Sequence, residues 1–543
     1  MKADRQTFAL ASFICILIVF SLLVTHLSMN KPGSLFLSND ENTHHLMTKQ
    51  YAEEGKLYFD SPYNEDVDYA NNLHPRSMIT FEDRIVTFAF LGIMIHYGPA
   101  YTLLGENIYL IALPLLLATV LALYCIVSLY RKESSTTLLI TALSTPAALA
   151  FIYYLGKPLY NNAITASFFL FFVYFMLKFQ KEKKILDVYL AALFACTTIW
   201  LRYNFVLFVG LFLLIHFLSN SKLWKDRLIL SRHSFLLVLF ALFAFVLPLL
   251  IVNNATYKSP SSYGYDLFYK IVPSTENKDA TTGSKIFSLL VPFSESFNDD
   301  LFTEGDIFSQ EKYEQRFTTN TKVSLILISP ILFLFFLISL FRWKQSRKYL
   351  AYLIIPVYFI LYTATGNTYL SGSELLTLQK SIVRYWIAIV LVAVIFMVVR
   401  LREQFSYQKG ATLLLLAGVL VFSVHAVATD INDDLRIVNK QMEKRELYLP
   451  YLNESTYLLS ANEDKFFAET KQITWWCASN GCEANLQTDK LAKTLKNLLA
   501  HGEVIYALKT SQLNDNIIGK LEAEGLSFEK VKDDLYRVGV TEK

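Results

Sequence analysis

FALASFICILIVFSLLVTHLS, the apolar run at residues 8–28, is preceded by Lys2 and Arg5. An apolar run of about twenty residues matches the thickness of a bilayer and exceeds the short apolar core of a signal peptide. No small-x-small cleavage pattern follows it. We therefore expect residues 8–28 to be a retained membrane anchor whose N-terminal end lies in the cytoplasm.

The composition of the whole chain is that of a membrane protein. Of its 543 residues, 53% are hydrophobic and only 18% are charged, and the mean hydropathy is +0.35. The net charge is +3, and the basic residues occur in short clusters rather than in one patch, so nothing supports a nucleic-acid partner. We expect a polytopic α-helical protein whose surroundings are the lipid bilayer.

Further apolar runs predict a series of membrane-spanning helices. The segment 86–104 contains Gly92, Gly98 and Pro99, so we expect a broken helix there that returns without crossing. Together with the anchor, the runs then predict about eleven spans. After residues 8–28, these spans are expected at 107–130, 137–155, 160–178, 185–201, 203–219, 234–253, 323–341, 349–365, 382–400 and 410–428.

Basic residues predict the orientation of these spans. Clusters such as 131–132, 181–184 and 400–402 would lie on the cytoplasmic side, whereas the short outer connections hold Lys157, Arg202 and Lys380. Basic residues near the ends of spans resist translocation. We therefore expect a multi-pass plasma-membrane protein with a cytoplasmic N-terminus, two large outer segments at 30–106 and 254–322, and an extracytoplasmic C-terminal tail.

The tail, residues 429–543, is predicted to be a small soluble α/β domain that follows a transmembrane domain at 1–428. Apolar runs at 456–460, 473–476, 503–508 and 526–538 alternate with helical periodicity at 489–500 and 511–524, which is typical of such a domain. Cys477 and Cys482 lie in the tail, outside the cytoplasm under this topology. We expect them to form a structural disulfide that closes a short loop.

The polar stretch SNDENTHH, at residues 38–45, follows the anchor after about ten residues, at the outer surface of the membrane if the anchor crosses it. One interpretation of Asp40 and Glu41 is a hydrated loop near lipid headgroups. The other is a carboxylate that deprotonates an acceptor hydroxyl while a sugar leaves its phosphate carrier. His44 and His45 would allow a divalent metal ion, but adjacent histidines point in different directions, so no metal and no other cofactor is expected.

The order of several motifs resembles the N-terminal half of the GT-C membrane glycosyltransferases of family 39, which include protein O-mannosyltransferases and the aminoarabinose transferases acting on lipid A. The resemblance covers about residues 8–180, and also Arg384-Tyr385 at the outer start of a late span. It implies a GT-C type fold and transfer of a sugar from a polyprenyl (dolichyl or undecaprenyl) phosphate to an unknown protein, lipid or glycan acceptor on the outer face. The motifs are Asp40-Glu41, Tyr51-Ala52, Glu54-Gly55, His74-Pro75, Gly105-Glu106-Asn107 and Arg131-Lys132.

The resemblance also assigns roles to individual residues. It places the catalytic acid on Asp40, with Glu41 as its neighbour. A second acid that many relatives carry in the next outer loop is absent, because Asn161 and Asn162 stand there. A donor phosphate needs cations near the membrane surface, and the candidates are Arg384, Lys157, Arg202 and Arg76. The candidate contacts to the sugar or acceptor are His44, His74, Asn161, Asn162 and Tyr385.

Two other functions stay open at this point. Trp475-Trp476 is similar to the start of the Trp-Trp-Asp motif of oligosaccharyltransferase catalytic subunits, which would imply transfer of a glycan en bloc, but Cys477 replaces the Asp. A non-enzymatic lipid or glycan transporter would be expected to carry ionisable residues in the middle of its spans, and few are found there.

Overall fold

The computed structural model describes residues 2–29, 36–61, 72–87, 89–130, 141, 149–203, 205–206, 208–210, 212–213, 227–262, 264, 267, 387, 409–461, 463–467, 470–475, 484–510 and 513–541. The chain divides into two compact units. The first, here called the helical unit, comprises Met1–Ser28, Tyr109–Pro248 and Asp279–Asp433. The second, here called the mixed unit, comprises Met29–Ile108, Leu249–Lys278 and Asp434–Lys543, so the first predicted outer segment and most of the tail belong to one folded body.

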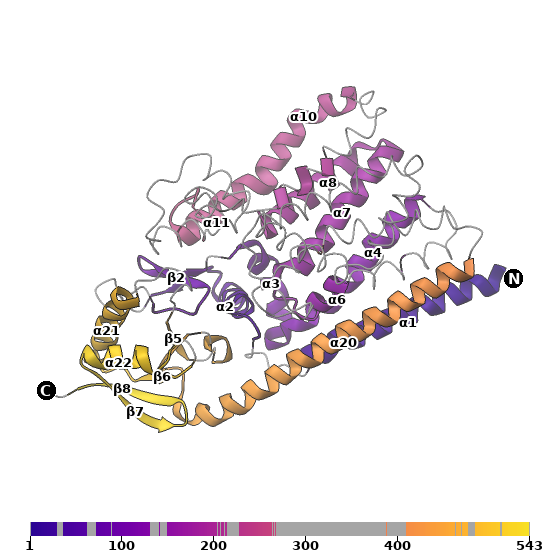
Figure 1. Ribbon diagram of the computed structural model, residues 1–543. Helices are drawn as coiled ribbons and strands as arrows, with labels where there is room; N and C mark the ends of the chain where they lie inside the picture. The colour runs from indigo at the N-terminus through magenta and orange to yellow at the C-terminus, as the bar shows by residue number, and fades with distance from the viewer. Residues whose placement is uncertain are drawn as a thin grey trace, which may run out of the picture. The chain divides into compact units, whose positions relative to one another are not determined.

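The helical unit is built from long apolar helices. Helices α4, α7 and α8 pack against one another in chain order, as Figure 1 shows. Rings on α7 and α8 stack in this packing, with Phe175 and Phe194 at a centroid distance of 5.6 Å. The described α-helices that lie in or begin in this unit are α1 (Lys2–Met29), α4 (Ala112–Tyr130), α6 (Leu149–Leu155), α7 (Asn161–Glu182), α8 (Ile185–Leu201), α10 (Arg227–Ala241), α11 (Leu247–Tyr257) and α20 (Lys409–Tyr448).

Four helical stretches in the described part of the chain are long and apolar enough to cross a membrane. They are Ala9–His26, Gly92–Tyr130, Asn161–Glu182 and Phe235–Tyr257, and Ile185–Leu201 is a shorter apolar helix. The prediction of a protein with several apolar spans is therefore confirmed. The expected spans at 323–341, 349–365 and 382–400 lie outside the described residues, apart from Ile387, so the total of about eleven stays a prediction.

The apolar segment 86–104 is helical through Gly98 and Pro99, so the break expected within it is not found. Its start belongs to strand β3 (Arg84–Thr87), and helix α3 (Gly92–Leu104) has 13 residues, which extend about 20 Å against the roughly 30 Å of a bilayer core. A 3-10 segment, η1 (Gly105–Ile111), follows with a non-helical residue at Asn107. The spanning helix α4 consequently begins at Ala112 rather than at the expected residue 107.

Two helices continue past the ends that the sequence predicts for their segments. Helix α20 (Lys409–Tyr448) is continuous for 40 residues across the predicted division at 428/429. A helix of 40 residues is about 60 Å long, roughly twice the thickness of a bilayer core. Helix α10 continues through a π-helical turn, η3 (Leu242–Val246), into α11 (Leu247–Tyr257). Large apolar side chains such as Phe235 and Phe243 are more than 60% exposed along this second helix.

The tail forms a mixed sheet, which confirms the predicted C-terminal α/β fold. The strands are β4 (Tyr457–Ser460), β5 (Lys471–Thr474), β6 (Ile505–Leu508), β7 (Leu526–Lys532) and β8 (Leu535–Val540), in the order β5-β4-β6-β8-β7. β4 pairs in parallel with β5 and β6, whereas β8 pairs antiparallel with β6 and β7. The single apolar run predicted at 526–538 is a hairpin, because the chain turns at Asp533 with φ 40°.

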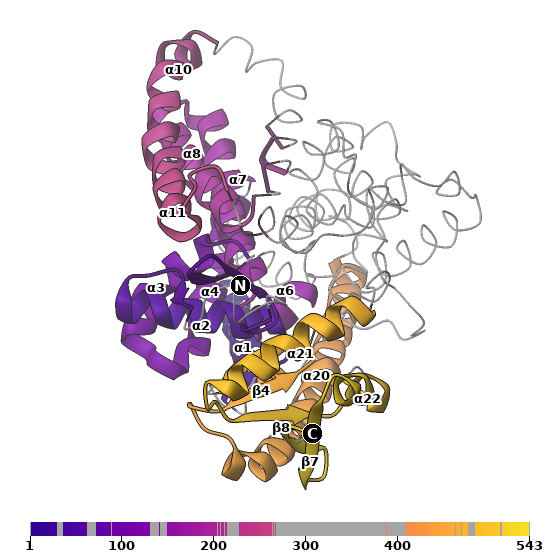
Figure 2. The same cartoon turned by 90° about the vertical axis from the view of Figure 1, so that its left-hand side faces the viewer.

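Helices cover the sheet on two faces, which explains why all four residues of β4 are buried. Leu459 packs on one face with the helices α21 (Ala484–Ala500) and α22 (Asp515–Ala523), and Figure 2 shows α21 lying along the sheet. Leu458 packs on the opposite face with Val438 of α20. Successive side chains of a strand point to opposite faces, so this single strand closes two cores.

The first outer segment folds around a polar helix, α2 (Asn39–Glu54). The helix ends at Gly55, whose φ of 71° is a left-handed conformation that glycine adopts without strain. Helix α2 packs on α3 so closely that a Cβ atom at Gly98 would lie 2.5 Å from Cδ1 of Tyr51. A small antiparallel sheet adjoins it, formed by β1 (Phe59–Asp60), β2 (Met78–Phe81) and β3 in the order β1-β3-β2.

The start of the second outer segment docks on this small sheet. Lys258 Nζ lies 2.6 Å from Glu82 Oε2 and 2.6 Å from Asp83 Oδ1 in the turn between β2 and β3. Tyr257 donates a hydrogen bond from its hydroxyl to the carbonyl oxygen of Thr87 at 3.0 Å. Arg84 donates to the carbonyl oxygen of Ala255 at 2.6 Å. The first two segments of the mixed unit are therefore linked by specific polar contacts.

The predicted orientation is testable at two exposed positions of the described chain. Ser455 lies in the tail before β4, and Lys184 lies in the short turn between α7 and α8. In a chain whose native cysteines are replaced by Ala, we expect Ser455→Cys to react with a membrane-impermeant maleimide in intact cells. Lys184→Cys should react only after the cells are opened, because its turn is expected in the cytoplasm. The opposite labelling pattern would show that the predicted orientation in the membrane is wrong.

Candidate active site

Asp40 lies in the first turn of α2, in a position that the local sequence dictates. Ser38 caps the helix with extended backbone angles, and its Oγ accepts a hydrogen bond from the backbone N–H of Asp40 at 3.1 Å. Ser followed three residues later by Glu41 is the sequence of a capping box. The positive end of the helix dipole favours a negative charge, so the start of α2 stabilises the ionised carboxylate of Asp40.

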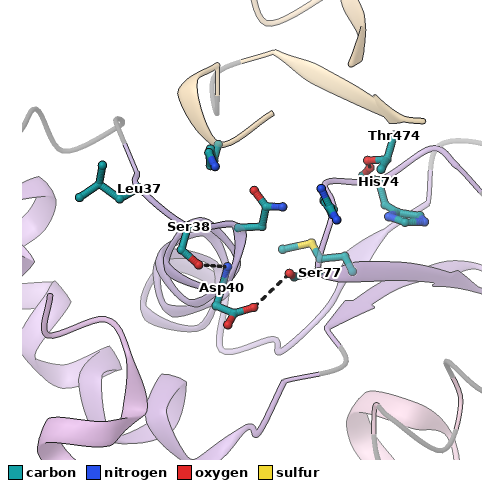
Figure 3. A pocket seen from close by; sticks show the side chains of 10 residues that line it. Leu37, Ser38, Asp40, His74, Ser77 and Thr474 are labelled. Atoms are coloured by element: carbon teal, nitrogen blue, oxygen red, sulfur yellow. Dashed lines mark hydrogen bonds between the residues drawn. The ribbon is translucent and has the colours of Figure 1, made fainter. Parts of the chain in front are cut away.

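A cavity of about 420 Å³ adjoins Asp40. Figure 3 shows the start of α2, the turn before β2 and the tail meeting around it. Ser77 donates a hydrogen bond from Oγ to Oδ1 of Asp40 at 3.2 Å. The volume falls within the range of about 300–1,000 Å³ that is usual for small-molecule sites. The residues that line the cavity are Leu37, Ser38, Asn39, Asp40, His74, Arg76, Ser77, Met78, Lys465 and Thr474.

Hydrogen bonds to the first outer segment hold the tail at this cavity. The backbone N–H of Thr474 donates to the carbonyl oxygen of Asn72 at 2.8 Å, and Asn72 Nδ2 donates back to the carbonyl oxygen of Thr474. The Thr474 hydroxyl donates to the carbonyl oxygen of His74. All of these residues belong to the mixed unit, so the cavity is formed within one compact body.

Two cationic side chains, Arg76 and Lys465, line the cavity together with Asp40. Burial lowers the pKa of Lys465, and the neighbouring carboxylate of Asp464 opposes this change. Asp464 is itself 1% exposed, and burial raises its pKa although its Oδ2 accepts a hydrogen bond from the backbone N–H of Arg76 at 2.8 Å. The arrangement can bind an anion in the same cavity as a carboxylate able to accept a proton.

His74 is buried in the wall of the cavity. Its Nδ1 lies 2.7 Å from the carbonyl oxygen of Pro75. A carbonyl oxygen only accepts, so this contact requires the proton to be on Nδ1. The contact fixes the orientation of the ring, and the prediction that His74 contacts a sugar or acceptor stays compatible with this placement.

A second polar cluster links α2 to the residues after α3. Glu106 Oε2 lies 3.1 Å from His45 Nε2, and Glu106 Oε1 lies 3.5 Å from Lys49 Nζ and accepts a hydrogen bond from the Tyr101 hydroxyl at 2.7 Å. The bond to His45 contributes most to lowering the pKa of Glu106 to about 2, and that to Tyr101 adds to it. Glu106 is therefore ionised at neutral pH and anchors the face of α2 that carries His45.

Two residues predicted beside Asp40 do not line the cavity. Glu41 is 0% exposed and His44 is 3% exposed, both within the buried part of α2. Successive residues of a helix point about 100° apart, so adjacency to Asp40 in sequence does not direct Glu41 into the same space. The catalytic role of Glu41 and the sugar contact of His44 remain predictions.

The helical unit holds four of the predicted residues. Lys157 and Arg202 are buried, at 6% and 2% exposure, and the Lys157 Nζ atom lies 4.3 Å above the ring of Tyr153. Asn161 donates from Nδ2 to the carbonyl oxygen of Leu201 at 3.1 Å, which joins the segments that carry the two cations. Asn162 is buried in the first turn of α7. Their roles in binding the carrier phosphate and the sugar stay predictions.

Four predicted residues lie outside the part of the chain that the structure describes: Arg384, Tyr385, Cys477 and Cys482. Their roles in phosphate binding, sugar contact and disulfide formation stay predictions. Within the described residues, no group of three or more His, Cys, Asp or Glu side chains is arranged to hold a metal ion.

The tail residues of the cavity, Lys465 and Thr474, were missed by reasoning from sequence. Asn72 and Thr474 are 402 positions apart, and no local periodicity reports such a contact. Ser77 was missed as well, although its place after His74-Pro75-Arg76 offered a signal. A polar residue beside a predicted site motif is a candidate partner for the catalytic carboxylate.

No family model matches the sequence, and no curated protein matches it. Among solved structures, the chain is similar to the crystal structure of ArnT from Cupriavidus metallidurans bound to undecaprenyl phosphate, with 10% sequence identity and a TM-score of 0.48. The match covers 96% of this chain and 97% of that chain.

Glu106 provides a prediction about stability and pH. Its folded-state pKa lies below its usual value of 4.5, so the stability it adds is present above pH 4.5 and is lost as the pH falls toward 2. Glu106→Gln should lower the Tm of the purified protein by about 2 °C at pH 7, because the charge that contacts His45 and Lys49 is lost. The expected change is small because the Glu106 side chain is partly exposed. Thermal unfolding at several pH values measures this difference, which should shrink below pH 4.5. A Tm difference independent of pH would contradict the ion-pair role.

Proposed function

We propose that this protein is a membrane glycosyltransferase that moves a sugar from a polyprenyl phosphate to an acceptor hydroxyl on the outer face of the membrane. The observation that carries the proposal is the shared cavity, where Asp40 lies with the cations Arg76 and Lys465. The chemistry requires a proton acceptor near the acceptor hydroxyl and cations near the departing phosphate. The order of motifs around Asp40 supports the same assignment.

The reaction assigns each group a task. Asp40 accepts the proton of the acceptor hydroxyl as the new bond from oxygen to the anomeric carbon forms. The bond from that carbon to the phosphate oxygen breaks, and the polyprenyl phosphate leaves with the electron pair. Arg76 and Lys465 stabilise the negative charge that the phosphate gains, because charge-assisted hydrogen bonds strengthen as charge develops.

The proposal includes further residues from the helical unit and from outside the described chain. Lys157 and Arg202 are proposed as cations for the carrier phosphate, and their burial on joined segments supports this role. Arg384 and Tyr385 are proposed at the start of a late span, on the sequence resemblance. Asn161 donates to Leu201, so we propose that it shapes the site, while Asn162 contacts the sugar.

The cellular setting is part of the same proposal. We propose a multi-pass plasma-membrane protein with a transmembrane domain at 1–428 and an extracytoplasmic domain at 429–543. The acceptor and the sugar then meet outside the cytoplasm. Mass spectrometry of lipids from cells lacking this chain should reveal an accumulated polyprenyl-phosphate sugar, which identifies the donor.

The role of Asp40 predicts a specific loss. Asp40→Asn should lower turnover of the accumulated donor by about 10² to 10⁴, because the amide does not accept the proton. Binding of undecaprenyl phosphate by the purified variant should stay close to normal. Glu53→Gln, a change of an exposed acid at the far end of the same helix, is the matched control. Near-normal turnover by Asp40→Asn would reject the role of Asp40 as the base and favour the interpretation of residues 38–45 as a hydrated segment near lipid headgroups.

The role of Lys465 predicts a loss of affinity instead. Lys465→Met keeps most of the side-chain volume and removes the charge, so the Kd for undecaprenyl phosphate should rise about 10-fold. Binding to the full chain in detergent is measured with undecaprenol as the uncharged comparison ligand. Lys530→Met, on the exposed part of β7, should leave the Kd unchanged. Equal affinity of the Lys465 variant and the wild type would remove Lys465 from the phosphate site.

A further inference from the structure

The turn that precedes β2 has an unusual backbone at Ser77. The backbone N–H of Met78 donates to the carbonyl oxygen of Pro75 at 3.1 Å, which closes a four-residue turn. Ser77 is the third residue of this turn and has φ 66°. Glycine is the residue usually found at positive φ in that position, because a Cβ atom is disfavoured there.

The side chain of Ser77 gives a reason for a residue other than glycine at this position. Its Oγ donates a hydrogen bond to Oδ1 of Asp40 at 3.2 Å, as Figure 3 shows. Glycine would relieve the backbone and lose this bond. Unfavourable backbone conformations of this kind persist where the surrounding structure holds them, often at functional sites.

The tail supplies that surrounding structure. The carboxylate of Asp464, 1% exposed, accepts the backbone N–H of Arg76 at 2.8 Å, directly before Ser77 in the chain. Thr474 bonds to the carbonyl oxygen of His74 on the same stretch. On the other side, the Thr87 hydroxyl donates to the carbonyl oxygen of Ser77 at 3.5 Å. The turn is thus fixed from the tail and from β3.

We infer that Ser77 is a positioning residue for Asp40, and that the tail sets the position of Ser77 through the bond between Asp464 and the backbone of Arg76. This inference rests on the proposed function, in which Asp40 is the base. The bond from Ser77 to one carboxylate oxygen holds the orientation of the Asp40 side chain in the cavity. The tail is then required for catalysis without its Asp464 touching the substrate.

Two substitutions at Ser77 distinguish the effect of its hydroxyl group from the effect of its backbone conformation. Ser77→Ala and Ser77→Gly both remove the donor, but only Gly relieves the positive φ. Both variants should lower kcat about 10-fold with KM for the donor unchanged, since a hydrogen bond to a charged group is lost. The donor is the polyprenyl-phosphate sugar fraction from cells that lack the chain, and release of polyprenyl phosphate is measured. Full activity of Ser77→Gly beside a defective Ser77→Ala would show a role of the turn alone and overturn the inference.

The pH profile gives a readout that a structural defect would not move. The Ser77 hydroxyl favours the ionised carboxylate, so its loss should shift the acidic limb of the kcat profile to higher pH by about one unit. The other ionisable groups that line the cavity are His74, Arg76 and Lys465, and Glu41 follows Asp40 on α2. Their charges are the same in the variants and the wild type, so an unshifted limb would contradict the inference.

Variants of Asp464 test the link to the tail. Asp464→Asn keeps an oxygen that accepts the Arg76 N–H and should retain kcat, whereas Asp464→Ala should reproduce the kinetics of Ser77→Ala. The double variant Asp464→Ala with Ser77→Ala should be no worse than either single variant, because both act through one contact. Asp515→Asn, an exposed acid of the same tail, is the control. Additive losses, or equal kcat for Asp464→Asn and Asp464→Ala, would overturn the link.

Asp40→Asn is measured in parallel to separate this inference from the proposed function. An inactive Asp40→Asn beside fully active Ser77 variants would leave the proposed function standing and reject only the positioning role. An active Asp40→Asn would reject the proposed function itself.

Discussion

The reciprocal bonding of Asn72 with Thr474 is the interaction on which the candidate site depends. It joins the stretch that leads to His74 and Arg76 to the end of strand β5, so the tail and the first outer segment share one body. Leu73 extends this joint into the core of the tail, where it packs with Leu459 and Ile473. The hydrogen bonds of Asn72 align the first outer segment with β5, and the burial of Leu73 stabilises this arrangement. Together they fix the wall of the cavity.

The contacts of Asn72 and Leu73 with the tail make the tail part of the candidate site. A soluble domain attached to a transmembrane enzyme could simply follow it in the chain. Here the same domain contributes Lys465 and Thr474 to the cavity of Asp40 and holds the turn of Ser77. The Asp40 carboxylate thus lies on a helix whose start is capped by Ser38, beside a cavity that Lys465 and Thr474 of the tail complete.

Much of this could be predicted from the sequence, and the failures have physical causes. Apolar runs and turn residues are local signals, so the first apolar helix and the strands of the tail were predicted. Asp40 and His74 were predicted from motif order and Arg76 as an outer cation, and the three line one cavity. Contacts between distant segments leave no periodicity, which is why Lys465 was missed. Neighbouring residues of a helix point in different directions. Glu41 was expected beside Asp40 in the cavity, but it is buried in α2 and does not line the cavity.

Photochemical cross-linking of the carrier tests the central claim, that the first outer segment and the tail together bind the sugar phosphate. A polyprenyl phosphate with a photoreactive group next to the phosphate would be bound to the full chain, irradiated, and mapped by mass spectrometry. We expect adducts on two peptides, one containing His74 to Met78 and one containing Asp464 to Thr474, both suppressed by excess undecaprenyl phosphate. Adducts confined to the membrane helices, with none on the tail, would contradict it.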